Sequence, residues 1–268
     1  MSIKTKIKRL IQPKKTIYSP VYVVDESEIL KGKNIVITGG SSGIGRSIAV
    51  LACNYEANVV IVGRNESELI ESCKKAGENC KYLVMDLTNR IDETFLEKCE
   101  QILNGNITNL VNNAGVYLDY NSLNYSDDDY NKIFSLNVRA PFFLSQFFVK
   151  YFLEKHIAGN ILFTSSNRSL MGDDGPYGMS KAAINNFIEG LAREYVKYGI
   201  RVNGVAPGMT ASNINHVDVN GDLFSSGCKG ERVLLPDEIA QVSCFLMSDI
   251  SKCITGTIIP CDEGDRLR

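Results

Sequence analysis

The feature that most constrains this chain is a regular alternation of short apolar runs with longer amphipathic stretches. Short strands that are apolar on both faces belong in a parallel sheet that helices cover on both sides. The runs predict strands at residues 34–38, 59–62, 82–85, 109–111, 160–164, 201–206 and 257–259. The amphipathic stretches predict helices at 44–53, 66–76, 92–103, 127–154 (interrupted near Pro141), 177–198 and 236–247. We expect an α/β doubly wound parallel sheet of about seven strands in a single domain.

Composition excludes several classes of protein. A net charge of −2 and a pI near 5.8 argue against binding to nucleic acid or other polyanions. Two histidines and eight cysteines without a CxxC pair predict no metal site and a reducing, cytoplasmic setting. No run of about 18 apolar residues occurs, so we expect no membrane span.

Charge separates the N-terminus from the rest of the chain. Residues 1–15 contain six Lys or Arg and no acidic residue, which leaves −8 on the remainder. We therefore predict a basic N-terminal arm at 1–29, in which 21–24 could form a short strand, and a dinucleotide-binding catalytic domain at 30–268. A solvated arm and a contact with a partner subunit or an anionic surface both remain open.

A glycine-rich turn follows the first predicted strand, where residues 38–45 read Thr-Gly-Gly-Ser-Ser-Gly-Ile-Gly. Glycines at a strand-to-helix turn let backbone amides approach a pyrophosphate at the helix N-terminus. A P-loop would need Lys where Arg46 stands. The Gly39-x-Ser41-x-Gly43 pattern also fits the nucleophile elbow of α/β hydrolases, but that elbow follows a later strand. Dinucleotide binding is the best interpretation.

Further motifs occur in order along the chain, and together they resemble the short-chain dehydrogenase/reductase family, in particular its 3-oxoacyl-(acyl carrier protein) reductase branch. The resemblance covers roughly residues 30–264 and implies a Rossmann-type fold and an NAD(P)-dependent oxidoreductase of the CH–OH class. The motifs after the glycine turn are Asp86-Leu87, Asn112-Asn113-Ala114-Gly115, Asn137, Ser165-Ser166, Tyr177-x3-Lys181, Asn203-x3-Pro207-Gly208 and Cys261-Asp262-Glu263-Gly264.

The resemblance implies that Asn137, Ser166, Tyr177 and Lys181 are catalytic. Tyr177 and Lys181 are four residues apart and would share one face of a helix. A nearby ammonium lowers the pKa of a tyrosine, so Tyr177 could exchange a proton with the substrate near neutral pH. Ser166 would polarise the substrate oxygen, with Ser165 as the alternative. By resemblance, Lys181 also holds the nicotinamide ribose and Asn137 anchors a water.

The end of the second strand predicts NADP(H) rather than NAD(H). Gly63 replaces the acid that would bind a ribose 2′-hydroxyl, and Arg64 suits a 2′-phosphate. An ordinary exposed turn residue is the alternative interpretation of Arg64, and Ser41 or Arg46 could share the phosphate. By resemblance, the cofactor-binding residues are Gly39, Ser41, Ser42, Gly43, Ile44, Gly45, Arg64, Asp86, Leu87, Asn113, Ala114, Gly115, Tyr177, Lys181, Pro207, Gly208, Thr210 and Ser212.

The substrate is less constrained by the sequence. The polar loop at 209–235 should cover it, and Arg168 could contact it. The expected reaction is reduction of a ketone to a secondary alcohol, or the reverse. A polar (sugar-like or anionic) keto substrate, an acyl thioester and a cofactor-binding regulatory or scaffolding protein without turnover all remain open. Glu263, where the family usually has Gly, could alter the final turn.

The family also predicts a homodimer or homotetramer, in which the two long helices at 127–154 and 177–198 pack against a second subunit. The second helix carries small and apolar residues suited to such a contact, namely Ala182, Ala183, Phe187, Leu191 and Tyr195.

Overall fold

The computed structural model describes residues 26–118, 121–212, 215 and 217–267. In this part of the chain a single seven-stranded sheet has the order β3-β2-β1-β4-β5-β6-β7, and every neighbouring pair is parallel. The predicted doubly wound sheet is therefore confirmed. The strands are β1 (Asn34–Thr38), β2 (Asn58–Gly63), β3 (Cys80–Val84), β4 (Asn109–Asn112), β5 (Asn160–Thr164), β6 (Arg201–Pro207) and β7 (Ile258–Cys261).

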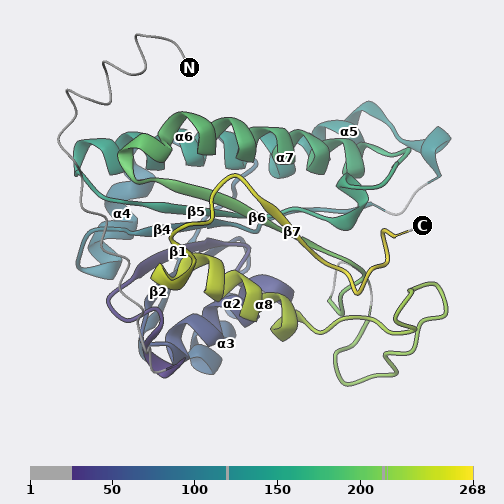
Figure 1. Ribbon diagram of the computed structural model, residues 1–268, viewed down its shortest axis with the longest axis horizontal. Coiled ribbons are helices and arrows are strands. Elements are labelled where there is room, and N and C mark those ends of the chain that lie inside the picture. Colours follow the sequence, from purple (N-terminus) through teal and green to yellow (C-terminus); the bar gives the residue numbers. More distant parts are fainter. Residues whose placement is uncertain (1–25, 119–120, 213–214, 216, 268) are drawn as a thin grey trace, which may run out of the picture.

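Helices cover both faces of the sheet (Figure 1). Helices α4 (Thr94–Leu103), α6 (Ala140–Glu154) and α7 (Pro176–Tyr195) pack on one face, with α5 (Asp127–Phe134) preceding α6. Helices α2 (Gly43–Asn54), α3 (Glu66–Ala76) and α8 (Pro236–Met247) pack on the other. The described one-turn 3₁₀ segments are η1 (Glu26–Glu28), η2 (Ser122–Asn124), η4 (Asn167–Ser169), η5 (Val196–Tyr198) and η6 (Asp249–Ser251).

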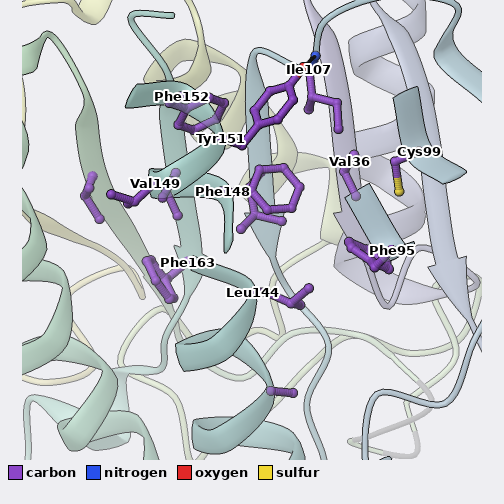
Figure 2. Close-up of a cluster of buried hydrophobic side chains, with 14 of the residues drawn as sticks. Val36, Phe95, Cys99, Ile107, Leu144, Phe148, Val149, Tyr151, Phe152 and Phe163 are labelled. Atoms are coloured by element: carbon purple, nitrogen blue, oxygen red, sulfur yellow. Dashed lines mark hydrogen bonds between the residues drawn. The ribbon is translucent and has the colours of Figure 1, made fainter. Parts of the chain in front are cut away.

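Alternation along the central strands supplies two hydrophobic cores. In β1, Val36 faces the core under α4 and α6, whereas Ile35 and Ile37 face the core over α2 and α8. Figure 2 shows the first core, in which the Phe148 ring packs against those of Phe95 and Phe152. Side chains of a fully buried strand need apolar partners on both faces, which explains the continuous apolar runs in the sequence.

The long helix predicted at 127–154 is interrupted close to Pro141, as expected, but the proline itself is not the break. The break is the π-helical segment η3 (Ser135–Arg139), which contains Asn137 and ends before Pro141. Pro141 instead stands in the first turn of α6, where a missing backbone N–H is tolerated. π-helical turns are rare and occur frequently at functional sites.

Smaller boundaries also shift. The third strand begins at Cys80 rather than residue 82, and the last strand runs over Ile258–Cys261 rather than 257–259. Leu30 is fully buried against the α2 core, in keeping with a domain that begins near residue 30. Residues 1–25, which include most of the predicted basic arm and its possible strand at 21–24, lie outside the described residues. The boundary between arm and domain at residue 30 therefore stays a prediction. Among the described residues no helix is both long and apolar enough to cross a membrane.

Candidate active site

The strand order reverses between β1 and β4, and a cavity of about 790 Å³ opens where the carboxyl ends of these strands diverge. In doubly wound sheets this switch point is where dinucleotides bind. The cavity extends from the glycine turn after β1, past the ends of β4 and β5, to the loop after β6. One continuous space thus connects the predicted cofactor motifs with the predicted catalytic residues.

The glycine turn and the N-terminus of α2 line this cavity. Ser42 is the N-cap of α2 but makes no side-chain capping bond, so the first N–H groups of the helix remain available for an anion. Gly43 lies at φ +52°, a conformation that side chains rarely adopt. A Cβ on Gly45 would lie 2.3 Å from the Gly39 carbonyl oxygen. The turn therefore fits a pyrophosphate and requires glycine for two different reasons.

Buried side chains from the neighbouring strands hold the turn in place. The Thr38 hydroxyl accepts from the backbone N–H groups of Asn113 (3.0 Å) and Ala114 (3.1 Å). The Asn113 amide donates to the Gly39 carbonyl at 3.1 Å and accepts from Thr164 at 3.1 Å. The ends of three strands are thus tied together, which fixes the floor of the cavity.

Two arginines near the turn have different environments. Arg64 is exposed and lines the cavity, and its charge contributes to a lowered pKa of Asp86, of which bonds from Thr88 are the main cause. Arg46 instead donates through Nε to the Ser41 carbonyl (3.1 Å) and to Ser72 (2.9 Å). Arg46 is therefore held by the protein itself, whereas Arg64 faces the cavity.

The predicted catalytic side chains converge on the other end of the cavity. Tyr177 and Lys181 lie on α7, with Lys181 Nζ 5.7 Å from the centre of the Tyr177 ring. The Ser166 side chain acts on Tyr177 in the direction that lowers the pKa of its phenol. Lys181 is 5% exposed and donates to the Thr164 carbonyl at 2.7 Å. A phenol, a hydroxyl and an ammonium group are thus assembled beside one space.

Burial governs the protonation of this group. It raises the pKa of Tyr177, and Ser166 and the charge of Arg168 oppose that rise without cancelling it. It also lowers the pKa of Lys181 to about 8. The expected lowering of the Tyr177 pKa is therefore wrong for this arrangement, because removal from water disfavours the phenolate more than nearby groups favour it.

The side chains of Ser166 and of its alternative, Ser165, have different neighbours. Ser165 donates to Asn185 at 2.6 Å and lies 3.1 Å from the Ser169 hydroxyl, so its side chain belongs to a separate network. Of the two serines, Ser166 is the one that affects the pKa of Tyr177, so its assignment as the substrate-polarising hydroxyl stays the better prediction. Ser166 lies two residues after the end of β5, so this strand positions its backbone.

Asn137 lies behind the cavity and does not line it. Its side chain accepts from the Val116 N–H at 2.8 Å and donates to the Val116 carbonyl at 3.0 Å and to Ser180 at 3.1 Å. A Cβ added to Gly115 would lie 3.4 Å from Asn137 Oδ1 and 3.5 Å from Lys181 Nζ. Asn137 therefore braces the loop beside Lys181, and its role as a water anchor stays a prediction.

The loop after β6 closes the cavity together with the C-terminal segment, and both lie at the same end of the molecule in Figure 1. Glu263 adopts φ +48° and accepts from Arg232 at 3.0 Å. Arg232 also binds Glu238 at 2.7 and 2.8 Å. Glu263 thus joins the final turn to the covering loop. A glycine at this position, as is usual in the family, has no side chain that could make this contact.

The structure brings most of the predicted residues together. Arg168 lines the cavity, as do all the predicted cofactor residues apart from Gly45. Gly45 does not line the cavity, but it packs closely against the Gly39 carbonyl and so supports the turn. Three residues that line the substrate end, Tyr117, Asp173 and Asp265, were not predicted. The first two flank recognised motifs, whereas no local signal indicates Asp265. Among the described residues no cluster of three or more possible ligands could hold a metal ion.

A doubly wound sheet with a cavity of about 790 Å³ at its switch point, lined by the glycine turn and by Ser166, Tyr177 and Lys181, defines an NAD(P)-dependent oxidoreductase. The family model described as short chain dehydrogenase matches residues 33–221. The chain therefore belongs to the short-chain dehydrogenase/reductase family, and its reaction is of the dehydrogenase or reductase class acting on CH–OH groups.

Individual relatives differ in substrate and cofactor. An L-rhamnose 1-dehydrogenase (NADP(+)) of Thermoplasma acidophilum is 32% identical over 87% of this chain and 96% of its own. A 3-oxoacyl-[acyl-carrier-protein] reductase of Chlamydia pneumoniae is 30% identical, over 88% and 97% respectively. A 3-ketoacyl-(acyl-carrier-protein) reductase from Brucella melitensis, solved with NADH, has a TM-score of 0.79 at 25% identity, with 89% and 100% covered.

Proposed function

We propose that this protein is an NADPH-dependent carbonyl reductase that converts a ketone to a secondary alcohol, or runs the reverse reaction. The observation that carries the proposal is the grouping of Ser166, Tyr177 and Lys181 in the cavity that the glycine turn also lines. A protein that only bound the cofactor would need neither the phenol nor the hydroxyl beside it. Turnover is therefore the better interpretation than a regulatory or scaffolding role.

Each side chain has a defined task in this proposal. The bound cofactor supplies or accepts a hydride. Ser166 donates a hydrogen bond to the substrate oxygen, and Tyr177 Oη transfers a proton to that oxygen during reduction. A raised pKa keeps Tyr177 protonated at neutral pH, the state that a proton donor needs. Lys181 is held by the Thr164 carbonyl and, on the family pattern, also contacts the ribose.

The preference for NADPH over NADH rests on the end of β2. Arg64 is exposed to the cavity, and Gly63 presents no carboxylate to repel a 2′-phosphate. Arg46 is engaged by Ser41 and Ser72, which leaves Arg64 as the better partner for the phosphate. The NADP(+)-dependent L-rhamnose dehydrogenase among the relatives supports this preference, whereas the reductase solved with NADH keeps the alternative open.

Replacing Tyr177 by Phe tests the assignment of the proton donor. The variant should bind NADPH with a Kd close to that of the wild type, because the ring is kept and only the hydroxyl is lost. Its kcat should fall by about 10²–10⁴-fold, the usual contribution of a positioned acid. Cofactor titration and steady-state kinetics measure the two effects. A variant that keeps more than about a third of wild-type turnover would show that another group supplies the proton.

We further propose a homodimer or homotetramer that uses α6 and α7. Phe142 and Phe143 on α6 are 41% and 36% exposed, and Ala182 and Ala183 on α7 are also exposed. Phe142 stacks towards Phe187 of α7 at 5.2 Å between ring centres, so the exposed apolar surface spans both helices. Apolar patches of this kind mark protein contacts. Light scattering at micromolar concentration should give a dimer or tetramer, and a monomer would refute the proposal.

A further inference from the structure

The substrate end of the cavity, beyond Tyr177 from the glycine turn, carries an excess of acidic side chains. Among the described residues that line it, the charged ones are Arg168, Asp173, Asp174 and Asp265. Three carboxylates therefore face one guanidinium. Lys181 also borders this end, but it is buried and already bonded to a backbone carbonyl. One of its three N–H donors is therefore already used by the protein.

The one guanidinium at this end is already paired. Arg168 Nη1 lies 3.2 Å from Asp173 Oδ2, and the Asp173 side chain is only 5% exposed. The Arg168 guanidinium also stacks over the Tyr117 ring at 5.0 Å, and that ring meets Tyr177 edge-on at 5.0 Å. Arg168 is thus fixed next to the reacting phenol with its charge largely balanced. Its remaining N–H groups can donate to a neutral oxygen.

Asp265 reaches the cavity from the C-terminal segment, where two neutral donors hold it. Asn167 Nδ2 donates to Oδ2 at 3.2 Å, and the Lys229 backbone N–H donates to Oδ1 at 3.2 Å. A carboxylate has about four acceptor positions, so two remain for a ligand. Asn167 directly follows Ser166, and all three residues line the same cavity. Within the described residues no cation is bonded to Asp265.

From this arrangement we infer that the substrate is a neutral, hydroxyl-rich compound of the sugar or polyol class, and that Asp265 determines specificity by accepting its hydroxyl hydrogens. This inference rests on the proposed function, because it names the substrate class of the same site. Hydroxyl groups can donate to the carboxylates and accept from Arg168. An anionic substrate, or an acyl chain attached through a phosphate-containing carrier, would be repelled by the unpaired carboxylates.

Matched neutral and anionic compounds test the substrate class. The full-length protein is assayed with saturating NADP⁺ or NADPH against neutral hexoses and pentoses and their uronic acids, for example D-galactose and D-galacturonate, together with keto sugars. An acetoacetyl thioester and a simple 1,2-diketone complete the panel. Neutral hydroxylated compounds should exceed their carboxylate counterparts in kcat/KM by about tenfold or more. A higher kcat/KM for the uronates or the thioester would overturn the inference.

Variants test the part of Asp265. Asp265→Asn removes the charge and half of the acceptor capacity, so it should raise KM for the neutral substrate and reduce the neutral-to-anionic ratio by at least about threefold. Asp128→Asn removes the same charge from an exposed position on α5 outside the cavity and should leave the ratio unchanged. Asp174→Asn provides a second cavity variant that leaves the C-terminal segment intact, and it should reduce the ratio in the same direction. An unchanged ratio in both cavity variants would contradict the inference.

Failure of the inference and failure of the proposed function are distinguishable. Turnover of the diketone or the thioester without any neutral sugar or polyol would overturn the substrate class and leave the reductase intact. The absence of NADP(H)-dependent turnover with every compound, in a protein that still binds NADPH, would contradict the reductase itself.

Discussion

The two ends of the cavity are built in different ways. The cofactor end consists of strand termini and backbone, held by buried bonds such as those of Thr38 and Asn113. The substrate end consists of loops and the C-terminal segment, joined by partly exposed ion pairs such as Arg232 with Glu263. Backbone packed against backbone tolerates little change, whereas loops joined by side chains can vary. The difference explains how one fold keeps its cofactor and changes its substrate.

Lys181 stands where the two ends meet, and its burial gives the largest effect on stability that we expect. Burial lowers its pKa from 10.5 to about 8, so the unfolded chain binds more protons than the folded one between these pH values. The free energy of unfolding should therefore rise with pH across this window, by at most about 3 kcal/mol. Below pH 8 Lys181 is charged in both states, and the folded protein bears the full cost of burying that charge.

Measuring the free energy of unfolding at pH 7.5 and pH 10.5, in nucleotide-free wild type and Lys181→Met, isolates this contribution. Other groups titrate in both proteins, so the difference between the two slopes is the relevant quantity. Parallel pH dependences would mean that Lys181 is not buried as the structure shows.

At the cofactor end, the largest expected effect on binding comes from Arg64. A charge-assisted hydrogen bond contributes about 1.5–3 kcal/mol. Arg64→Ala should therefore weaken NADPH binding about tenfold to a hundredfold and leave NADH nearly unchanged. Added salt should reduce the preference of the wild type, because Arg64 is exposed. Titration of both cofactors with both proteins measures this, and tighter binding of NADH by the wild type would refute the NADPH preference.

A matched pair of glycine substitutions compares the two ends directly. A Cβ on Gly45 would meet the Gly39 carbonyl at 2.3 Å and Asn113 Nδ2 at 2.4 Å, whereas a Cβ on Gly172 would meet nothing within 4 Å. Gly45→Ala should destabilise the protein by about 1–3 kcal/mol and weaken cofactor binding. Gly172→Ala should be neutral or slightly stabilising, since it only restricts the unfolded chain. Equal effects on the melting temperature would remove the contrast between the two ends.

Much of the cofactor end could be predicted because its signals are local. The apolar runs predict buried strands, the glycines mark the turn that directly follows β1, and the spacing of Tyr177 and Lys181 places both on one face of α7. Each inference depends on backbone geometry over a few residues, and that geometry is encoded in those residues. The alternation of strands and helices predicts the order of elements for the same reason.

Tertiary structure alone decided which distant side chains meet. Asp265 lies 98 residues from Asn167 in the sequence, yet the two share a hydrogen bond at the substrate end. The sequence allows Arg46 to bind a phosphate, but in the structure it donates a hydrogen bond to Ser72 of α3. The pKa of Tyr177 rises because packing shields it from much of the water, although its spacing from Lys181 predicts the reverse. Such contacts, and the burial that accompanies them, depend on how separate elements pack, and no local pattern of residues records that packing.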